Sequence, residues 1–271
     1  MSIKNINNVK LGVIGCGKMA SAILGGVVSN GFLKPENIFV YDINPEIAGN
    51  LAKNYGFTVE NSIENLLNSS NTILLAVKPF VVNEVMENIK NSYNNHLVMS
   101  ILAGVKIEKY LSFIPDINII RIMPNTPALI NLGMSAVCPS QNSSESDCDF
   151  VIEFMKNCGE VLVTKEDEMD IITALSGSGP AYFYKIIELM ASAAHKLGFD
   201  YKKALLLSAQ TALGSAKMVI ENDFNVNQLI KNVTTPGGCT EVGNNVLNNS
   251  DIDMILDKTI KDTAQKAHDL G

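Results

Sequence analysis

The feature that most constrains the fold is a glycine turn between a strand-like segment and a helical one near the start of the chain. Residues 11–14 are apolar, Gly15-Cys16-Gly17 follow, and apolar residues then recur at helical spacing up to Val28. A strand, a glycine turn and a helix in this order make the dinucleotide-binding fingerprint, here with Ala20 in the third small position. The free N–H groups and the positive end of such a helix bind phosphate groups. The stretch therefore predicts a nicotinamide dinucleotide site.

The small residues of this stretch have separate predicted roles. Gly15 permits the tight turn, Gly17 lets a pyrophosphate approach the backbone, and Ala20 lets the helix pack closely on the strand. A glycine triplet alone can also be no more than a turn. The flanking strand and helix favour the dinucleotide site, and so does Asp42, which ends the next predicted strand. An acid at that place binds the adenosine ribose.

The first 165 residues alternate between strand-like and helix-like segments. The predicted strands after the first are residues 38–41, 57–59, 72–77, 96–100, 118–123 and 161–163, and the predicted helices include residues 45–55, 63–67 and 106–113. This alternation is typical of a doubly wound sheet of parallel strands. In such sheets the ligand lies beyond the carboxyl ends of the strands. We therefore expect one crevice, formed by Gly15, Asp42 and residues 76–79, 100–104 and 123–126.

The remaining residues, 166–271, are predicted to be almost entirely helical. The fold class is therefore α/β, with a Rossmann domain at residues 1–165 followed by an all-α domain. Two helical segments, residues 180–197 and 202–220, are apolar around most of their circumference. Helices of this kind must be covered on every side. A domain of about a hundred residues has too little core to cover two of them, so we expect a second subunit to do so.

Two further glycine-rich segments are predicted to start helices in the second half of the chain. They are SGSGP at residues 176–180 and TTPGGCT at residues 234–240. Proline in a first turn and Ser or Thr at a cap are start signals. The N–H groups at such a start can hold a carboxylate, and Thr235 and Thr240 add hydroxyl donors. The structural alternative is that both segments are only caps and close helix contacts.

Charge and composition disfavour several classes of function. The formal net charge of −7 argues against binding to the phosphates of a nucleic acid. No apolar run approaches the ~20 residues that span a bilayer, and no basic amphipathic stretch suggests a membrane surface. The N-terminal segment lacks the apolar core of a secretory signal. The five cysteines are odd in number and form no C-x-x-C pair, which predicts a reduced, cytoplasmic protein without a metal site.

Three separated motifs carry a resemblance that covers essentially the whole chain. They are RIMPNTPALINLGMSAV, SGSGPAY and TTPGGCTEVGNNVL, and IGCGKMASAILGG and LAVKP accompany them in the first domain. On these motifs the chain resembles the pyrroline-5-carboxylate reductase family. The resemblance implies reduction of the cyclic imine of 1-pyrroline-5-carboxylate to L-proline, the last step of proline biosynthesis, with NADPH or NADH. It also implies a helical domain that dimerises by interleaving helices, with dimers often assembled into larger rings.

The resemblance also assigns site residues by position. The implied dinucleotide contacts are Gly15, Cys16, Gly17, Lys18, Met19, Asp42, Asn61, Ala76, Val77, Lys78, Pro79 and Ala103. The implied substrate contacts are Ser178, Thr235, Gly237, Gly238, Cys239 and Thr240. Two residues depart from the family pattern. Asp223 stands where some members have an acid that contacts the substrate. Because Asn225-Val226 replaces the nearby His-Pro of those members, no role is assigned to Asp223. Glu241 follows Thr240 at a position where an apolar residue is usual.

The residue types agree with an imine as substrate. An alcohol dehydrogenase needs a base to take the hydroxyl proton, and each of the three histidines is expected to be a solvated or packing residue. An imine nitrogen can enter already protonated, so only hydride need be delivered, and Thr240 can hydrogen-bond that nitrogen as the catalytic residue. One alternative is a β-hydroxyacid dehydrogenase, in which Lys185 would be catalytic, but Leu189 stands where that family has asparagine. A non-catalytic dinucleotide-sensing protein is the other alternative, and the polar PGGCT segment argues against it.

The residues around Asp42 predict that NADH is used at least as well as NADPH. A 2′-phosphate would add negative charge beside the Asp42 carboxylate. Residues 43–46 contain no arginine, and Glu46 adds a further negative charge. Lys18 is the one cation nearby that can offset this repulsion.

Overall fold

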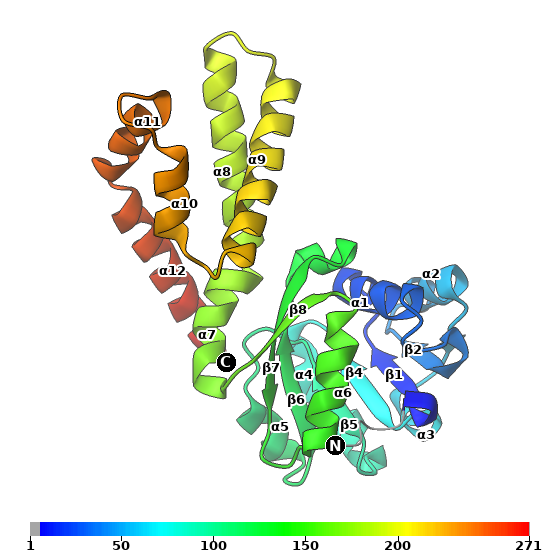
Figure 1. Cartoon of the computed structure of the whole chain (residues 1–271). Coiled ribbons are helices and arrows are strands. Elements are labelled where there is room, and N and C mark those ends of the chain that lie inside the picture. The colour runs from blue at the N-terminus through cyan, green and yellow to red at the C-terminus, as the bar shows by residue number, and fades with distance from the viewer. Residues whose placement is uncertain (1–5, 271) are drawn as a thin grey trace. The chain divides into compact units, whose positions relative to one another are not determined.

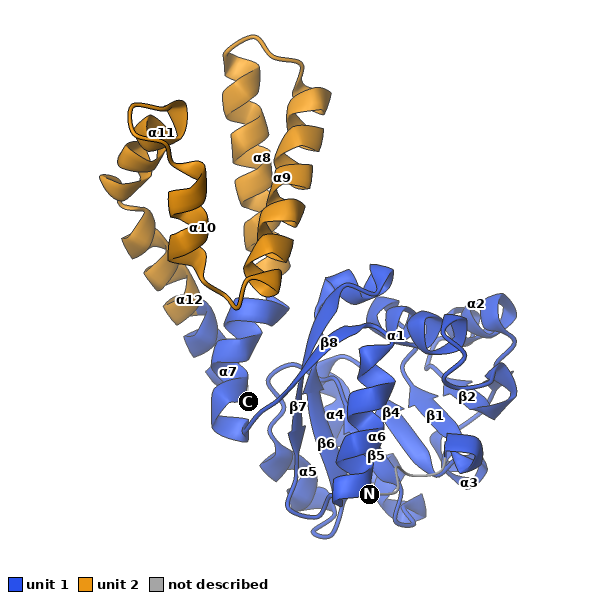
Figure 2. Ribbon diagram, in the orientation of Figure 1, with its two compact units in different colours: residues 1–178, 263–271 blue, residues 179–262 orange. Residues whose placement is uncertain are grey.

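The computed structural model describes residues 6–270, and Figure 1 shows its helices and strands along the chain. The chain divides into two compact units, coloured separately in Figure 2. One unit contains the chain up to Ser178 together with the segment from Thr263 onward, and the other runs from Gly179 to Asp262. The boundary predicted at residue 165 thus falls inside the first unit, and the division of roles at that residue stays a prediction.

Within the described residues the first unit contains one eight-stranded sheet. The strand order is β3-β2-β1-β4-β5-β6-β7-β8. The strands are β1 (Leu11–Ile14), β2 (Ile38–Tyr41), β3 (Thr58–Val59), β4 (Thr72–Leu75), β5 (Leu97–Ser100), β6 (Asn118–Met123), β7 (Gly133–Pro139) and β8 (Gly159–Val163). The pairing from β3 to β6 is parallel throughout. The predicted α/β class and doubly wound sheet are therefore confirmed.

One strand of this sheet was not predicted. β7 pairs antiparallel to β6, with Arg121 opposite Cys138, and β8 then pairs parallel to β7. Only the short helix η4 (Thr126–Ile130) lies between β6 and β7. A connection this short can join antiparallel neighbours, whereas a parallel pair needs a longer crossover. The expectation of a wholly parallel sheet is wrong at this pairing, and the predicted edge strand at residues 161–163 is β8.

Helices cover both faces of the sheet and create two separate cores. One core packs the sheet against α1 (Lys18–Ser29), α2 (Pro45–Tyr55) and α6 (Glu145–Lys156). The other packs it against α3 (Ile63–Ser69), α4 (Val82–Ser92) and α5 (Ile107–Phe113). Alternate residues of a strand face opposite sides, so Leu74 enters the first core while Ile73 and Leu75 enter the second. Both faces of the central strands are thus buried, as in other parallel sheets.

The first unit also includes a short helical segment and the end of the chain. The helical segment consists of η5 (Glu166–Glu168), α7 (Met169–Ile172) and η6 (Thr173–Gly177). The last turn of α12 (Ile252–His268) packs here, because Ala267 is buried and His268 Nδ1 lies 3.1 Å from Asp170 Oδ2. Glu166 Oε1 accepts a hydrogen bond of 2.5 Å from the buried side chain of Arg121. This ion pair joins the helical segment to β6.

The second unit is helical. It contains α8 (Gly179–Lys196), α9 (Tyr201–Glu221), α10 (Val226–Val233), α11 (Cys239–Asn248) and most of α12. α8 and α9 lie side by side along their lengths (Figure 1). Their apolar side chains remain strongly exposed in the single chain, including Phe183 at 62%, Leu206 at 69% and Ile220 at 62%. Exposed apolar surface of this extent marks a site of protein association. Among the described residues, no helix is long and apolar enough to cross a membrane.

Candidate active site

The glycine turn after β1 has the geometry that the fingerprint requires. Gly15 has a positive φ of 96°, and a Cβ there would lie 2.7 Å from the carbonyl oxygen of Ala76. The Gly15 N–H donates to the Tyr41 carbonyl at 2.8 Å, which ties the turn to β2. Gly17 is different, because a Cβ there would meet no atom within 4 Å. The fold itself therefore requires Gly15, whereas Gly17 leaves open space above the backbone.

The start of α1 can hold an anion. Gly17 is the N-cap residue and forms no side-chain cap, and the first N–H groups of an α-helix have no partner within the helix. No acidic side chain lies in the first turn, which begins with Lys18. Free N–H groups, the helix dipole and a lysine together favour a phosphate group at this place. The residues present thus fit the pyrophosphate of a dinucleotide.

Asp42 lies at the end of β2 and interacts with the glycine turn. Its Oδ2 accepts a hydrogen bond of 2.8 Å from the N–H of Cys16, and its Oδ1 accepts one of 2.9 Å from the N–H of Asn44. These two contacts fix the carboxylate beside the turn. Burial, and after it the Asp42 charge, raises the pKa of the Cys16 thiol to about 12. The thiol therefore stays neutral and adds no negative charge next to a bound phosphate.

A single pocket of about 1360 Å³ connects the ends of the strands. Its wall includes ten of the predicted dinucleotide contacts, namely Gly15, Gly17, Lys18, Met19, Asp42, Ala76, Val77, Lys78, Pro79 and Ala103. Residues 123–126, at the end of β6, line it as well. The expected crevice is thus present at the carboxyl ends of β1, β2, β4, β5 and β6.

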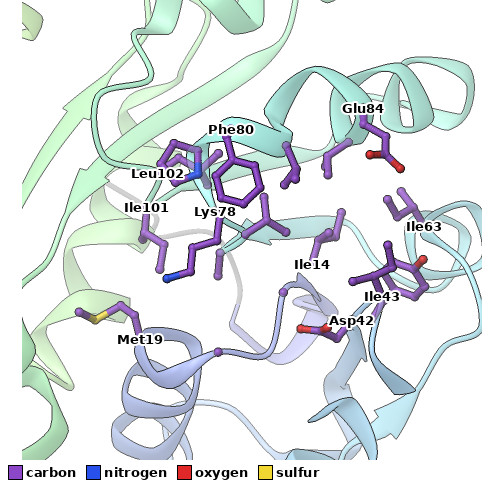
Figure 3. Close-up of a pocket in the computed structure, with 18 of the residues that line it drawn as sticks. Ile14, Met19, Asp42, Ile43, Ile63, Lys78, Phe80, Glu84, Ile101 and Leu102 are labelled. Carbon is purple, nitrogen blue, oxygen red and sulfur yellow. The ribbon is translucent and has the colours of Figure 1, made fainter. Parts of the chain in front are cut away.

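Sequence reasoning missed part of this wall and included two residues outside it. Cys16 is buried behind the turn, and Asn61 is exposed between β3 and α3 while its neighbours Ser62 and Ile63 line the pocket. The missed residues include Ile43, Phe80 and Glu84, which Figure 3 shows around the pocket together with Asp42. Ile43 and Phe80 are each 83% exposed. Apolar side chains at strand ends carry no chemical signal in a sequence, so only the structure identifies them.

The order of the strands gives the pocket two distinguishable ends. Asp42 and Ile43 follow β2 at one side, whereas residues 101–103 and 123–126 follow β5 and β6 at the other. In Figure 3, Asp42 and Ile63 lie on the side opposite Ile101 and Met19. The predicted contact of Asp42 with the adenosine ribose would place the nicotinamide end of a dinucleotide at β5 and β6.

The SGSGP segment does start a helix, since α8 begins at Gly179, but a π-helical turn leads directly into it. Residues Thr173–Gly177 form a π-helical turn, and the N–H of Ser178 donates to the carbonyl of Thr173 at 2.9 Å. The Ser178 N–H is therefore already bonded within the chain, and the substrate contact assigned to Ser178 stays a prediction. The Asn125 amide donates to the carbonyl and hydroxyl oxygens of Ser176 at 3.3 Å, and Gly177 lines the pocket. Single π-turns of this kind often occur at functional sites.

The TTPGGCT segment does start a helix, as predicted. The N–H of Gly238 donates to the Thr235 carbonyl at 2.9 Å, which closes a β-turn with Pro236 and Gly237 at its centre. Gly237 has a φ of 74°, so the pair has the residues that a type II turn requires. Gly238 is the N-cap of α11 and forms no side-chain cap. Thr235, Cys239 and Thr240 are exposed in the single chain.

Glu241, which had no explanation from the sequence, has a clear partner. Its Oε2 accepts a hydrogen bond of 2.8 Å from the N–H of Gly237. Glu241 is the acidic residue in the first turn of α11. A Glu in the third position that reaches back to a backbone N–H resembles one half of a capping box. The residue therefore stabilises the start of this helix in the free chain.

The histidines have structural partners, as expected. His96 is buried, and its Nε2 lies 3.0 Å from the Leu67 carbonyl. His195 Nδ1 lies 2.9 Å from the Phe199 carbonyl, and His268 pairs with Asp170. Lys185, the catalytic candidate of the β-hydroxyacid dehydrogenase alternative, forms an exposed ion pair with Glu188 at 3.0 Å. These contacts do not single out any of the four as a general base.

Comparison with known protein families gives two matches. Residues 166–270 match the model for pyrroline-5-carboxylate reductase dimerisation. Residues 10–104 match the model for NADP oxidoreductase, coenzyme F420-dependent. The second match contains the glycine turn and Asp42, and the first contains the TTPGGCT segment.

Full-length relatives agree with these matches. The chain is 34% identical to the pyrroline-5-carboxylate reductase of Methanosarcina acetivorans, over 98% of this chain and 99% of that protein. Among solved structures, the Plasmodium falciparum pyrroline carboxylate reductase with NADP bound is 34% identical, with a TM-score of 0.87 over 97% of this chain and 98% of the other. The Coxiella burnetii pyrroline-5-carboxylate reductase is 30% identical, with a TM-score of 0.92 over 98% and 99%.

Proposed function

The chain belongs to the pyrroline-5-carboxylate reductase family and is an NAD(P)H-dependent reductase of 1-pyrroline-5-carboxylate, and from this premise we propose which of its residues carry the reaction. The first unit binds the dinucleotide and the glycine-rich segment before α11 binds the substrate. The observation that carries the proposal is the open first turn of α1 above Gly17, with Asp42 fixed beside it.

The proposed dinucleotide contacts follow the length of the pocket. The N–H groups at the start of α1 hold the pyrophosphate, since Gly17 leaves the backbone accessible. Asp42 accepts hydrogen bonds from the adenosine ribose. Residues 101–103 and 123–126 receive the nicotinamide end. Cys16 acts only through its backbone N–H, which holds Asp42, and Asn61 stays a prediction of the family resemblance.

The proposed substrate contacts lie at residues 235–240. The N–H groups at the start of α11 hold the substrate carboxylate, and the Thr235 hydroxyl adds a donor. The Thr240 hydroxyl accepts a hydrogen bond from the protonated ring nitrogen and keeps the C=N carbon oriented for reduction. Gly237 and Gly238 shape the turn, and Cys239 contributes the first N–H of the helix. Ser178 is retained as a substrate contact through its hydroxyl, because its N–H is already used within the π-turn.

The proposed mechanism needs no general base. NAD(P)H, held by the residues that line the pocket, would supply the hydride for the imine carbon. The nitrogen of the imine enters protonated, so this chain need only bind, orient and shield the substrate. The partners found for the three histidines and for Lys185 are consistent with this requirement. Oxidation of a hydroxyacid, the main alternative, would require a base to remove the hydroxyl proton.

The helical half supports association of the chain with itself, because it matches a dimerisation model. We propose a homodimer through α8 and α9, whose exposed apolar side chains need cover, and assembly of dimers into a larger ring as the family resemblance implies. A mass from light scattering that is a multiple of two chains supports this proposal, and a stable, active monomer at micromolar concentration contradicts it. A cytoplasmic location is also proposed, supported by five cysteines that form no disulfide.

The activity is tested by following the absorbance of NADH and NADPH with freshly prepared 1-pyrroline-5-carboxylate. The proposal predicts oxidation of the cofactor and formation of L-proline. Matched assays with NAD and a 3-hydroxyacid test the dehydrogenase alternative. A flat trace with the imine together with turnover of the hydroxyacid would contradict the proposal, and flat traces with both substrates alongside normal dinucleotide binding would favour the sensing alternative.

A further inference from the structure

The carboxylate of Glu241 occupies a backbone donor of the segment that is proposed to hold the substrate. Its Oε2 lies 2.8 Å from the nitrogen of Gly237. Gly237 directly precedes Gly238, the N-cap residue of α11. An anion is therefore already present at this helix start when no ligand is bound.

We propose that Glu241 is a built-in competitor of the substrate carboxylate. This inference rests on the proposed function, because it assumes that residues 235–240 bind that carboxylate. In the free chain the Glu241 carboxylate neutralises the positive end of α11 and uses the Gly237 N–H. A substrate carboxylate that arrives at the neighbouring N–H groups meets a like charge and has to displace this side chain or tolerate its repulsion. The same residue weakens the retention of the product, since L-proline carries the same carboxylate.

The position of Glu241 allows its carboxylate to bind the Gly237 N–H and to release it again. The side chain is only partly buried, and its carboxylate is held by a hydrogen bond from the chain's own turn. The first turn of α11, residues 239–242, contains no lysine or arginine that could neutralise it. A flexible side chain with one backbone donor can leave without breaking a packed core. Glu241 can therefore alternate between its place on Gly237 and solvent as substrate enters and product leaves.

The role of Glu241 as a helix cap can be separated by experiment from its role as a competitor of the substrate carboxylate. As a helix cap, the residue needs only an oxygen that accepts the Gly237 N–H. The amide of glutamine supplies that oxygen without the charge. Glu241→Gln therefore keeps the cap and removes the competitor, whereas Glu241→Ala removes both. A cap alone predicts no effect of Glu241→Gln on substrate affinity.

The test is the KM for 1-pyrroline-5-carboxylate and the Kd for L-proline, measured on the intact wild-type enzyme and on Glu241→Gln. We expect both constants to fall by roughly two- to fivefold in the variant, the range of a charge interaction near a surface. The change should shrink as salt is raised, because salt screens the repulsion. The KM for the dinucleotide should not change. Asp253→Asn is the matched control, since Asp253 is an exposed acid in the first turn of α12 and its loss alters net charge equally.

Two outcomes overturn the proposal. A substrate KM and proline Kd that stay the same or rise in Glu241→Gln, with an unchanged melting temperature, show that the charge does not compete. An equal fall in Asp253→Asn shows that only net charge matters. The Thr240→Val variant distinguishes failure of the competitor proposal from failure of the proposed substrate site. If Thr240→Val lowers kcat/KM while Glu241→Gln has no effect, only the competitor is refuted; if neither has an effect, the substrate does not bind at this segment.

Discussion

The two glycine turns that begin α1 and α11 have the same local construction. Each contains a glycine with positive φ, 96° at Gly15 and 74° at Gly237, and each ends on a glycine N-cap without a side-chain cap. In each, the N–H of the residue before the N-cap donates to a carboxylate oxygen at 2.8 Å. The donor is Cys16 in the first turn and Gly237 in the second. The difference lies in where the carboxylate comes from.

In the first turn the carboxylate belongs to Asp42, on a neighbouring strand, and in the second it belongs to the helix itself. The first turn is fixed by the sheet, since Gly15 bonds to Tyr41 and faces the backbone of Ala76. The second turn is held by its own hydrogen bond between Gly238 and Thr235, and a Cβ on Gly237 would meet no atom within 4 Å. A preformed turn with a fixed acid suits a dinucleotide, whose pyrophosphate and ribose are not changed by the reaction. An exposed turn whose acid is held by one hydrogen bond from the turn itself suits the smaller substrate.

The largest expected effect comes from adding a methyl group to the first turn. Gly15→Ala places a Cβ against the Ala76 backbone at a positive φ, which should cost roughly 2 kcal/mol or more of stability. Activity should be lost with it. Gly17→Ala is the matched control, because its Cβ meets nothing in the free chain but occupies the space of the pyrophosphate. It should keep the melting temperature and raise the cofactor KM by about tenfold or more. Equal melting temperatures for the two variants would contradict this account of the turn.

The second turn should respond through the substrate. Thr240→Val removes one positioned hydrogen bond and should lower kcat/KM for 1-pyrroline-5-carboxylate by about 10- to 100-fold, or roughly 1.4 to 2.7 kcal/mol. Thr259→Val is a suitable control, since the Thr259 hydroxyl donates to the Ile255 carbonyl within α12. Steady-state kinetics at saturating cofactor measures both. An unchanged kcat/KM in Thr240→Val would remove this residue from the mechanism.

The acid of the first turn should affect the choice between cofactors. Asp42 is held beside the turn by two backbone N–H groups, so a 2′-phosphate would meet a fixed negative charge. We expect wild-type enzyme to use NADH at least as well as NADPH, and Asp42→Ser to shift the ratio of kcat/KM values toward NADPH by about tenfold, or roughly 1.4 kcal/mol. The ratio is measured at physiological salt. A wild-type preference for NADPH of tenfold or more, or an unchanged ratio in the variant, would contradict the role of Asp42.

The smallest expected effect is a difference in alkylation rate between the thiols of the two turns, Cys16 and Cys239. Burial raises the pKa of Cys16 to about 12, whereas Cys239 is exposed at the start of α11. Because the thiolate is the reactive form, a mild alkylating reagent at slightly alkaline pH should modify Cys239 and leave Cys16 intact. Mass spectrometry of the labelled peptides checks this, and L-proline should slow the labelling of Cys239. Faster labelling of Cys16 than of Cys239 would show that the first turn opens readily.

Sequence reasoning found the first turn because its signal is local. A strand, two glycines, a helix and an acid at the end of the next strand all lie within residues 11–42, and the structure places α2 and β6 at their predicted limits. It missed β7, whose residues 133–139 follow a Pro-rich loop and pair backwards against β6. A prediction based on alternating strands and helices cannot distinguish a loop from an antiparallel strand that follows another strand without a long helix between them.

Two further features depend on hydrogen bonds from backbone N–H groups that no residue pattern displays. At the π-turn Thr173–Gly177 the N–H of Ser178 donates to the carbonyl of Thr173, five residues earlier, so this N–H is not free where α8 begins. The bond between Glu241 and Gly237 depends on the conformation of a side chain, and the sequence showed only that the residue departs from the family pattern. Both lie in the helical half, where glycine marks several different turns.

The most direct test of the difference between the two turns is the Kd of the dinucleotide measured without substrate, by calorimetry, for wild type, Gly17→Ala and Thr240→Val. The account predicts that Gly17→Ala weakens dinucleotide binding by about tenfold or more, whereas Thr240→Val leaves it unchanged even as its kcat/KM for the imine falls. Equal weakening of dinucleotide binding by both variants would contradict the assignment of cofactor to one turn and substrate to the other.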